Sequence, residues 1–144
     1  MGEIYSFLSL SIVSNLRVHL NGNFSLPRGI LLSGNDFLQT NDGYDAKWNR
    51  YILHEVLPDL HIKLLEYIVV LEEARHKIEG TNFIPQTVSK FWPLPVRKDS
   101  IMDLYKDYGL NVIRKLGLKR QKIFWTEVDG GQFVSLREAE IFDE

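Results

Sequence analysis

The feature that most constrains this sequence is a long stretch of helical periodicity in its first half. From Asp45 to about Arg75, apolar residues recur at steps of three and four, the spacing of one face of an α-helix. Pro58 removes one backbone donor and crowds the preceding turn, so we expect the helix to kink or split near His54. We expect Trp48, which begins the stripe, to be a buried anchor of this helix. The predicted stripe consists of Trp48, Ile52, Val56, Leu60, Leu64, Ile68 and Leu71.

Strand patterns precede this helix. The segments Ile4–Val13 and Leu16–Leu20 alternate apolar and polar residues and predict a strand pair, in which the second strand turns its even-numbered residues toward the core. Asn21-Gly22-Asn23 predicts a turn. Phe24–Leu32 contains a proline and a glycine, so any strand there is short or at an edge, and we interpret Ser33–Gly43 as a loop.

A second helix and a hairpin follow. After a short aromatic segment at Val88–Leu94, apolar residues from Ile101 to Leu116 form an amphipathic stripe, with a capping box at Ser100 and Asp103 and a C-cap at Gly117. Ile123 opens a strand, a turn at Asp129-Gly130-Gly131 reverses it, and Ser135 with Glu138 forms another capping box. Because strands and helices are segregated, we expect an α+β fold: an N-terminal strand pair, a long kinked helix, a second helix and a C-terminal β-hairpin, packed in two layers.

The composition is that of an ordinary globular protein. With 144 residues, 44% of them hydrophobic, we expect residues 1–144 to form a single domain. The net charge of −2 provides no general basic field for nucleic acid, and no apolar run approaches the roughly 20 residues that span a bilayer. The chain has no Cys, which fits a reducing compartment, so we expect a cytoplasmic location without membrane partners.

The residues that could carry chemistry do not form a familiar catalytic pattern. His54 and His61 are seven residues apart, about 10 Å along a straight helix, so we interpret them as partly exposed side chains and not as metal ligands. Glu72-Glu73 would lie on a solvated helix face. The glycine-rich turns lack a following Lys-Ser/Thr pair, and no Ser stands in a Gly-x-Ser-x-Gly elbow. We therefore expect no catalytic residue, no metal, no cofactor, no ATP binding and no enzyme activity.

One charge cluster offers a possible interaction surface. Five cations fall in nine residues, close to Trp125, and they could bind RNA or an acidic peptide. The alternative, which we favour, is that they complement the dipole at the C-terminus of a helix. The cations are Arg114, Lys115, Lys119, Arg120 and Lys122.

The order of motifs along the chain resembles the sacsin family. Phe7–Leu10 followed by Leu16–Leu26 is similar to its signature, in which F-L-P-L-P precedes L-P-V-H-(V/I)-N-G-x-F-x-(L/V). Trp48-Asn49 at the start of the long helix, Phe91-Trp92-Pro93 and the closing hairpin resemble later landmarks in the same order. The residues that match this pattern best are Val18, His19, Asn21, Gly22, Phe24, Trp48, Asn49 and Pro93.

This resemblance implies a module of a chaperone. Sacsins are very large proteins whose repeats begin with an Hsp90-type ATPase domain, and the similar region follows that domain and is compared with the Hsp90 middle segment. The chain would be a fragment or module of such a protein, and its partners would be protein clients or the neighbouring ATPase domain of the same parent chain. Arg28 would either sense a nucleotide held by that neighbour or pair with Asp36 or Asp42. His19 and Asn21 would hydrogen-bond to backbone and fix the turn.

The leading functional hypothesis is therefore a non-catalytic module of a sacsin-like, Hsp90-related chaperone that serves interdomain coupling or client contact. The alternative is a free-standing protein-interaction domain that uses the aromatic and basic surface around Trp125. A third and more remote hypothesis is RNA binding through Arg114–Lys122, although we expect nucleic acid not to be a partner.

Overall fold

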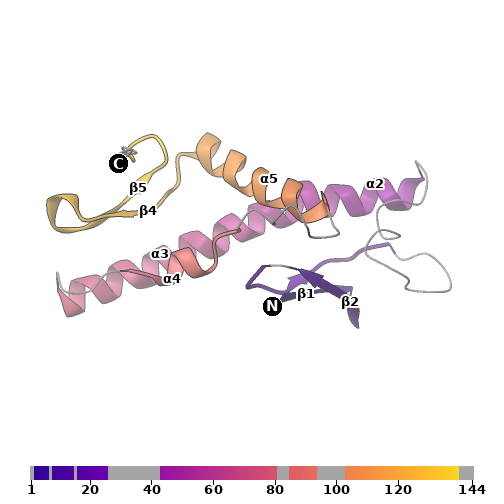
Figure 1. The fold of residues 1–144 in the computed structure, drawn as a ribbon, viewed down its shortest axis with the longest axis horizontal. Coiled ribbons are helices and arrows are strands. Elements are labelled where there is room, and N and C mark those ends of the chain that lie inside the picture. The colour runs from indigo at the N-terminus through magenta and orange to yellow at the C-terminus, as the bar shows by residue number, and fades with distance from the viewer. Residues whose placement is uncertain are drawn as a thin grey trace.

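The structure of the chain is a computed structural model that describes residues 2–6, 8–14, 16–25, 43–80, 85–93 and 103–139. It is mixed helix and strand, which confirms the α+β class (Figure 1). Arg28, the predicted strand beyond Ser25, most of the predicted loop and Ser100 lie outside the described residues. The elements are β1 (Gly2–Ser6), β2 (Leu8–Ser14), β3 (Leu20–Asn21), α2 (Tyr44–Tyr51), η1 (Ile52–Val56), α3 (Leu57–Glu79), α4 (Thr87–Lys90), α5 (Asp103–Lys119), β4 (Lys122–Thr126), η2 (Val128–Gly130) and β5 (Gln132–Ser135).

The long helix is built from α2, η1 and α3, which follow one another without a break (Figure 1). Its middle segment η1 is π-helical and ends two residues before Pro58. The ring of Pro58 crowds the carbonyl of His54, four residues earlier, and Pro58 has no N–H to donate to it. A wider π turn accommodates this conflict at the cost of one extra residue. The helix is therefore distorted near His54 by a π turn, but it is not split there.

The buried face of this helix matches the predicted one only in part: Ile52 and Ile68 are buried as predicted, whereas Val56 is 37% exposed. Trp48 is 37% exposed, Leu60 is 53% exposed and Leu71 is 46% exposed, so Trp48 is no buried anchor. A series that advances mostly by four residues drifts about 40° per step around an α-helix, so it cannot stay on one face. The residues that are in fact buried recur at steps of three and four in more even alternation. The π turn rotates the buried face relative to that of a regular α-helix. It contains Ala46, Asn49, Ile52, Leu53, Leu57, Pro58, His61, Ile62, Leu65, Ile68, Val69 and Glu72.

The N-terminal sheet also corrects the sequence prediction. Its strand order is β2-β1-β3, with β1 and β2 antiparallel and β3 parallel to β1. The predicted single strand Ile4–Val13 is therefore two strands that pair with each other, and the second predicted strand is reduced to Leu20–Asn21. The alternation of apolar and polar residues shows which side chains share a face of a strand. It stays the same when the chain folds back into a hairpin, so the sequence pattern does not show where β1 ends and β2 begins. Leu16 and Leu20 are buried as predicted.

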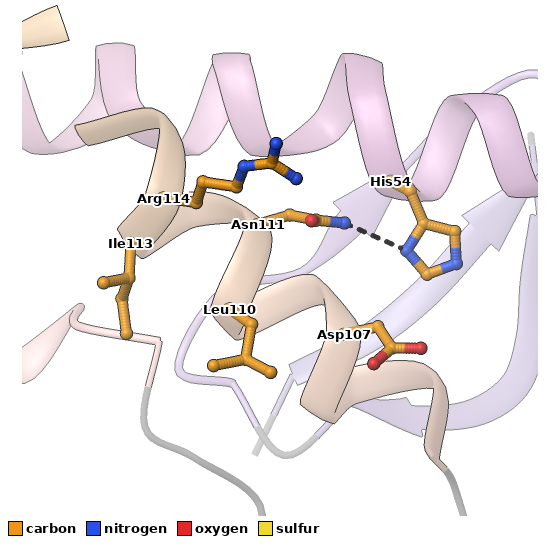
Figure 2. A pocket seen from close by; sticks show the side chains of 6 residues that line it. All are labelled: His54, Asp107, Leu110, Asn111, Ile113 and Arg114. Atoms are coloured by element: carbon orange, nitrogen blue, oxygen red, sulfur yellow. Dashed lines mark hydrogen bonds between the residues drawn. The ribbon is translucent and has the colours of Figure 1, made fainter. Parts of the chain in front are cut away.

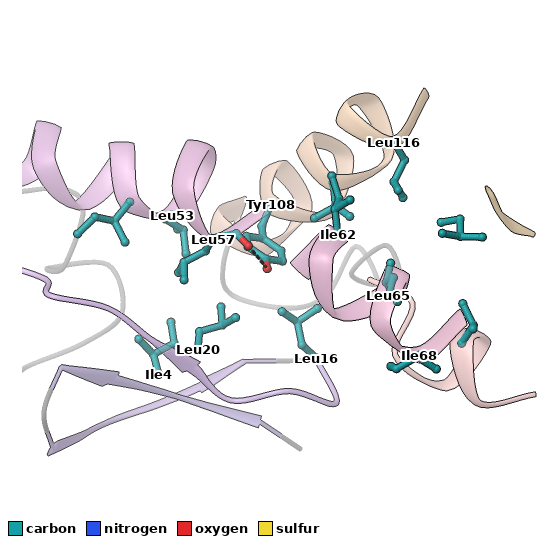
Figure 3. Close-up of a cluster of buried hydrophobic side chains, with 14 of the residues drawn as sticks. Ile4, Leu16, Leu20, Leu53, Leu57, Ile62, Leu65, Ile68, Tyr108 and Leu116 are labelled. Atoms are coloured by element: carbon teal, nitrogen blue, oxygen red, sulfur yellow. Dashed lines mark hydrogen bonds between the residues drawn. The ribbon is translucent and has the colours of Figure 1, made fainter. Parts of the chain in front are cut away.

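The hydrophobic core lies along the long helix. Figure 3 shows Ile4 and Leu20 of the sheet facing Leu53 and Leu57 of the helix. On the opposite side, Tyr108 belongs to α5 and joins the same cluster. The core therefore continues from the small sheet through the long helix to α5.

Helix α5 confirms the later part of the predicted stripe and corrects its end, while Ile101 lies outside the described residues. Tyr108, Val112 and Leu116 are buried. Gly117 does not cap the helix, which runs on to Lys119 and is followed by Arg120 at φ 52°. Lys119, the last residue of the helix, pairs with Asp59 of α3 at 2.7 Å, and the left-handed residue follows it.

The C-terminal hairpin has the predicted turn and cap. Strands β4 and β5 pair antiparallel, and Asp129, Gly130 and Gly131 all have positive φ in the turn between them. After β5, the Glu138 carboxylate accepts the backbone N–H of Ser135 at 2.8 Å, as in a capping box. That hydrogen bond is the main reason that the pKa of Glu138 is lowered. Within the part of the chain that the structure describes, no helix is long and apolar enough to cross a membrane.

Candidate functional site

Two of the residues that match the sacsin-like signature fix the N-terminal sheet. The Nδ1 atom of His19 accepts the backbone N–H of Glu3 at 3.2 Å, and its ring contacts that of Tyr5 edge to face at 5.5 Å. Asn21 pairs with Tyr5 through β3. The predicted structural role of His19 is confirmed, while Asn21 contributes through its backbone pairing.

The turn after β3 is held against α2 by the two residues that open the predicted helix. Asn49 is only 2% exposed, and its amide donates to the Ser25 carbonyl and accepts from the Ser25 N–H, each at 2.7 Å. The indole of Trp48 donates to the Asn23 carbonyl at 2.8 Å. The side-chain amide of Asn49 thus forms with the Ser25 backbone the two hydrogen bonds that a neighbouring strand would form. This docking places Trp48-Asn49 directly beside the signature.

Gly22 and Phe24 lie in the same turn, where the chain passes close to the helix and leaves little space for a side chain at position 22. A Cβ on Gly22 would lie 3.0 Å from the Phe24 ring and 3.1 Å from Cγ2 of Ile52, so the turn needs glycine for close approach. Its φ is not in the left-handed range, although the sequence suggested that property. Val18 packs against the core from the edge, and Phe24 is buried in it.

A polar contact within the core joins three helical segments. His61 of α3 is 4% exposed, which corrects its interpretation as a partly exposed residue. Its Nε2 lies 2.8 Å from the Phe91 carbonyl and must donate to it, so Nδ1 accepts the Tyr108 hydroxyl at 3.0 Å. Burial lowers the pKa of His61 and raises the pKa of Tyr108. Pro93, the last residue of the aromatic step, is also buried there and lies close to Gly109.

Another buried polar side chain corrects a prediction at the far end of α3. Glu72 is 2% exposed and therefore not part of a solvated face. Its Oε1 accepts the backbone N–H of Thr87 at 3.1 Å, which holds the start of α4 against the helix. Only Oε1 serves this contact, since Oε2 is buried and has no hydrogen-bond partner among the described residues.

A shallow pocket lies where η1 meets α5 (Figure 2). Its volume is about 630 Å³, and one of its walls is a π turn, a distortion that is frequent at functional sites. Asn111 lies 3.4 Å from Nδ1 of His54. Partial burial lowers the pKa of His54, and the nearby Asp107 opposes this shift. The lining residues are His54, Asp107, Leu110, Asn111, Ile113 and Arg114.

This pocket offers an imidazole and opposite charges in an open setting. Its residues come from η1 and from one face of α5. Such a set can bind a polar side chain from a partner. Among the described residues, no group of three potential ligands could hold a metal ion there or elsewhere.

The cations of the predicted basic cluster do not act together. The Lys115 ammonium lies 3.0 Å from Glu55 and 3.1 Å from Asp59, and the Lys119 ammonium lies 2.7 Å from Asp59. These pairs tie α5 to η1 and α3, and the two lysines lower the pKa of Asp59. Arg114 instead lines the pocket of Figure 2, whereas Arg120 and Lys122 are exposed beyond the helix.

Trp125 is also used in packing. Its ring contacts His76 at 5.0 Å and Phe133 at 5.1 Å, both edge to face. Phe124 packs similarly against Trp92 at 5.2 Å. Pairing in the hairpin is regular from Phe124 to Thr126, so the two rings lie on opposite faces of it. Both are half-buried because other rings cover each of them.

Single-stranded RNA is therefore expected to bind no more tightly than at the non-specific level. Two of the five cations are already paired within the fold, and the others could displace only a few counterions. The measurement is a fluorescence titration with a short RNA at about 150 mM salt. Submicromolar binding that is lost on charge reversal at Lys119 and Arg120 would contradict this prediction.

The most unusual surface is an exposed apolar stripe along the long helix. Tyr67 is 62% exposed and Ile78 is 84% exposed, and α2 adds Tyr44 at 81% and Tyr51 at 54%. Sequence reasoning missed this surface because it assigned several of its residues to the core. The stripe on α3 comprises Leu60, Leu64, Tyr67, Leu71, Ala74 and Ile78.

Comparison with known proteins gives no match to any family model, curated protein or solved structure. The resemblance to sacsins therefore remains a prediction based on the sequence motifs described above.

Proposed function

We propose that this chain is a non-catalytic protein-binding module of a sacsin-like, Hsp90-related chaperone. It serves client contact or coupling to a neighbouring ATPase domain, in the cytoplasm. The observation that carries this proposal is the exposed apolar stripe of the long helix, with Leu60, Tyr67 and Ile78 each more than half exposed. Large apolar side chains gathered on one exposed face mark a surface that binds other proteins.

The buried polar groups support a role without catalysis. Both ring nitrogens of His61 are used to hold α5 and the segment after α4 against α3. Lys115 and Lys119 are paired with carboxylates. The His61 imidazole and the Lys115 and Lys119 ammonium groups are thus used in packing, while the apolar stripe is left accessible.

The test is suppression of aggregation of a thermally unfolding client protein. We expect the wild-type chain to slow the aggregation, and the double variant Leu60→Glu/Leu71→Glu to need about tenfold more protein for the same effect. A tenfold change corresponds to about 1.4 kcal/mol of binding free energy, a modest loss for two apolar contacts.

The matched control is Leu118→Glu/Val128→Glu, which changes two apolar residues of α5 and η2 that are 71% and 62% exposed but lie off the stripe. This control should act as the wild type does. A wild-type chain without effect on any client, or equal losses in the two variants, would overturn the proposed function. Far-UV circular dichroism should show that all variants keep their helix content.

A further inference from the structure

We propose that the exposed stripe of α3 binds an amphipathic helix of a partner protein, with carboxylates flanking the apolar side of that helix. This inference rests on the proposed function and names the kind of partner. It is carried by the spacing of the stripe and by the charges along its edge.

The spacing predicts a helical partner. From Leu60 to Ile78, the stripe residues follow one another at alternating steps of four and three. This is the a/d spacing of a coiled coil, in which side chains fit between those of a second helix crossing at a shallow angle. A strand presents its side chains at a period of two and cannot match this pattern over five steps. Five of the six stripe residues are exposed and available for this fit, whereas Leu64 is half-buried because it also packs against the core.

The edges of the stripe carry positive charge. One edge is formed by Lys63, Val70 and Lys77, which are seven residues apart and lie at the position that flanks the seam of a coiled coil. Within the described ranges, neither lysine has an ion-pair partner within 4.0 Å. Arg75 lies on the other edge and pairs with Glu79 at 3.7 Å. A partner helix is therefore best matched if acidic residues flank its apolar side.

The carboxylates on this helix are paired or lie further round than the lysines. Asp59 is paired with Lys115 and Lys119, and Glu79 is paired with Arg75. Glu66 and Glu73 lie further round, beyond the lysines, at about 120–140° from the centre of the stripe. At that angle they face solvent and not a helix seated on the stripe. They remain exposed or half-buried.

A second copy of this chain fits less well. Antiparallel pairing would match Leu60 with Ile78 and Tyr67 with Leu71, which suits the apolar residues. The same register would set Lys63 of one copy beside Lys77 of the other, and these like charges repel. The charges thus favour an acidic helix of a different chain.

The test uses two synthetic peptides of about 21 residues, or three heptads. Both have Leu at every a and d position; one carries Glu and the other Lys at the flanking positions. With fluorescein-labelled peptides and anisotropy at about 100 mM salt, we expect the Glu peptide to bind the wild-type chain at least about tenfold more tightly than the Lys peptide.

The variants reverse or remove this preference. Lys63→Glu/Lys77→Glu should favour the Lys peptide, a gain of binding that a misfolded variant would not give. Leu71→Glu should abolish binding of both peptides, whereas Leu118→Glu on α5 should leave it unchanged. Equal binding of the two peptides, or a stripe-dependent dimer in sedimentation at micromolar concentration, would overturn the inference.

Failure of this inference can be distinguished from failure of the proposed function. If neither peptide binds but client aggregation is still slowed in a manner that depends on Leu60 and Leu71, the helical partner is wrong and the protein-binding role stands. If the client effect is also absent, both are wrong.

Discussion

Replacing Asn49 by alanine is expected to destabilise the protein by about 2–5 kcal/mol, because two hydrogen bonds to the Ser25 backbone are lost at once. Asn49 is 2% exposed, so water cannot easily replace its amide. The Ser25 N–H and carbonyl would lose their partners, and each such group costs about 1–3 kcal/mol where it is shielded from water. The free energy of unfolding in urea, compared with that of the wild type, measures this cost.

Two variants separate the hydrogen bonds from the general effect of substitution in this region. Asn49→Asp keeps an acceptor for the Ser25 N–H but loses the donor to the Ser25 carbonyl and buries a charge, so it should be as destabilising as the alanine. Asn111→Ala removes only a contact of 3.4 Å to His54 at the pocket and should cost less than about 1 kcal/mol. A loss below about 1 kcal/mol for Asn49→Ala would show that the turn is not held by this amide.

Local signals in the sequence were sufficient for several elements. The disturbance near His54 follows from Pro58 alone, since a missing N–H and a ring clash act on the preceding turn. The capping box of Ser135 and Glu138 and the turn at Asp129 also depend on residues within a few positions of one another. Such features are determined before any tertiary contact forms.

The face of the long helix could not be read in the same way. The predicted stripe placed Trp48, Leu60 and Leu71 in the core, whereas all three are exposed. A helix with apolar residues on two sides has two candidate core faces, and only the packing of other elements decides between them. The same ambiguity is what reveals the candidate surface, because the apolar residues that the core does not use remain exposed on α3.

The polar contacts of the core depend on residues far apart in the sequence. His61 is 47 residues from Tyr108 and 30 residues from Phe91 in the sequence, and it contacts both through its ring nitrogens. Neither residue has a local partner that would mark it as part of a network. The sequence placed both His61 and Tyr108 on helices, but their meeting depends on how those helices cross.

Acidification is expected to weaken the fold through His61. Burial lowers the pKa of this imidazole in the folded state below its ordinary value of 6.5. Below pH 6.5 the unfolded chain therefore binds a proton that the folded chain refuses, so stability falls as the pH falls from that value toward the folded pKa. The contribution is fully present above that window, and its slope cannot exceed about 1.4 kcal/mol per pH unit for one proton.

The measurement is the free energy of unfolding in urea between about pH 7 and pH 5, for the wild type and for His61→Gln. Glutamine does not titrate, so the variant should lose less stability than the wild type across this interval, with a difference of at most about 1.4 kcal/mol per pH unit. At pH 7 the variant itself should be about 1–3 kcal/mol less stable, because Tyr108 and the Phe91 carbonyl lose their fitted partner. The carboxylates whose pKa is lowered, Asp59 and Glu138, titrate below this interval and do not contribute to it.

His54 must be separated from this effect, since partial burial lowers its pKa as well. The control is His54→Gln, which should retain most of the pH dependence of the wild type, because His54 is half-buried and Asp107 stabilises its charged form. Tyr108→Phe removes the hydroxyl that donates to Nδ1 but leaves the imidazole buried, so the dependence should persist in this variant too. Parallel pH profiles for the wild type and His61→Gln would contradict the prediction, since they would mean that His61 binds its proton equally well in the folded and unfolded chains.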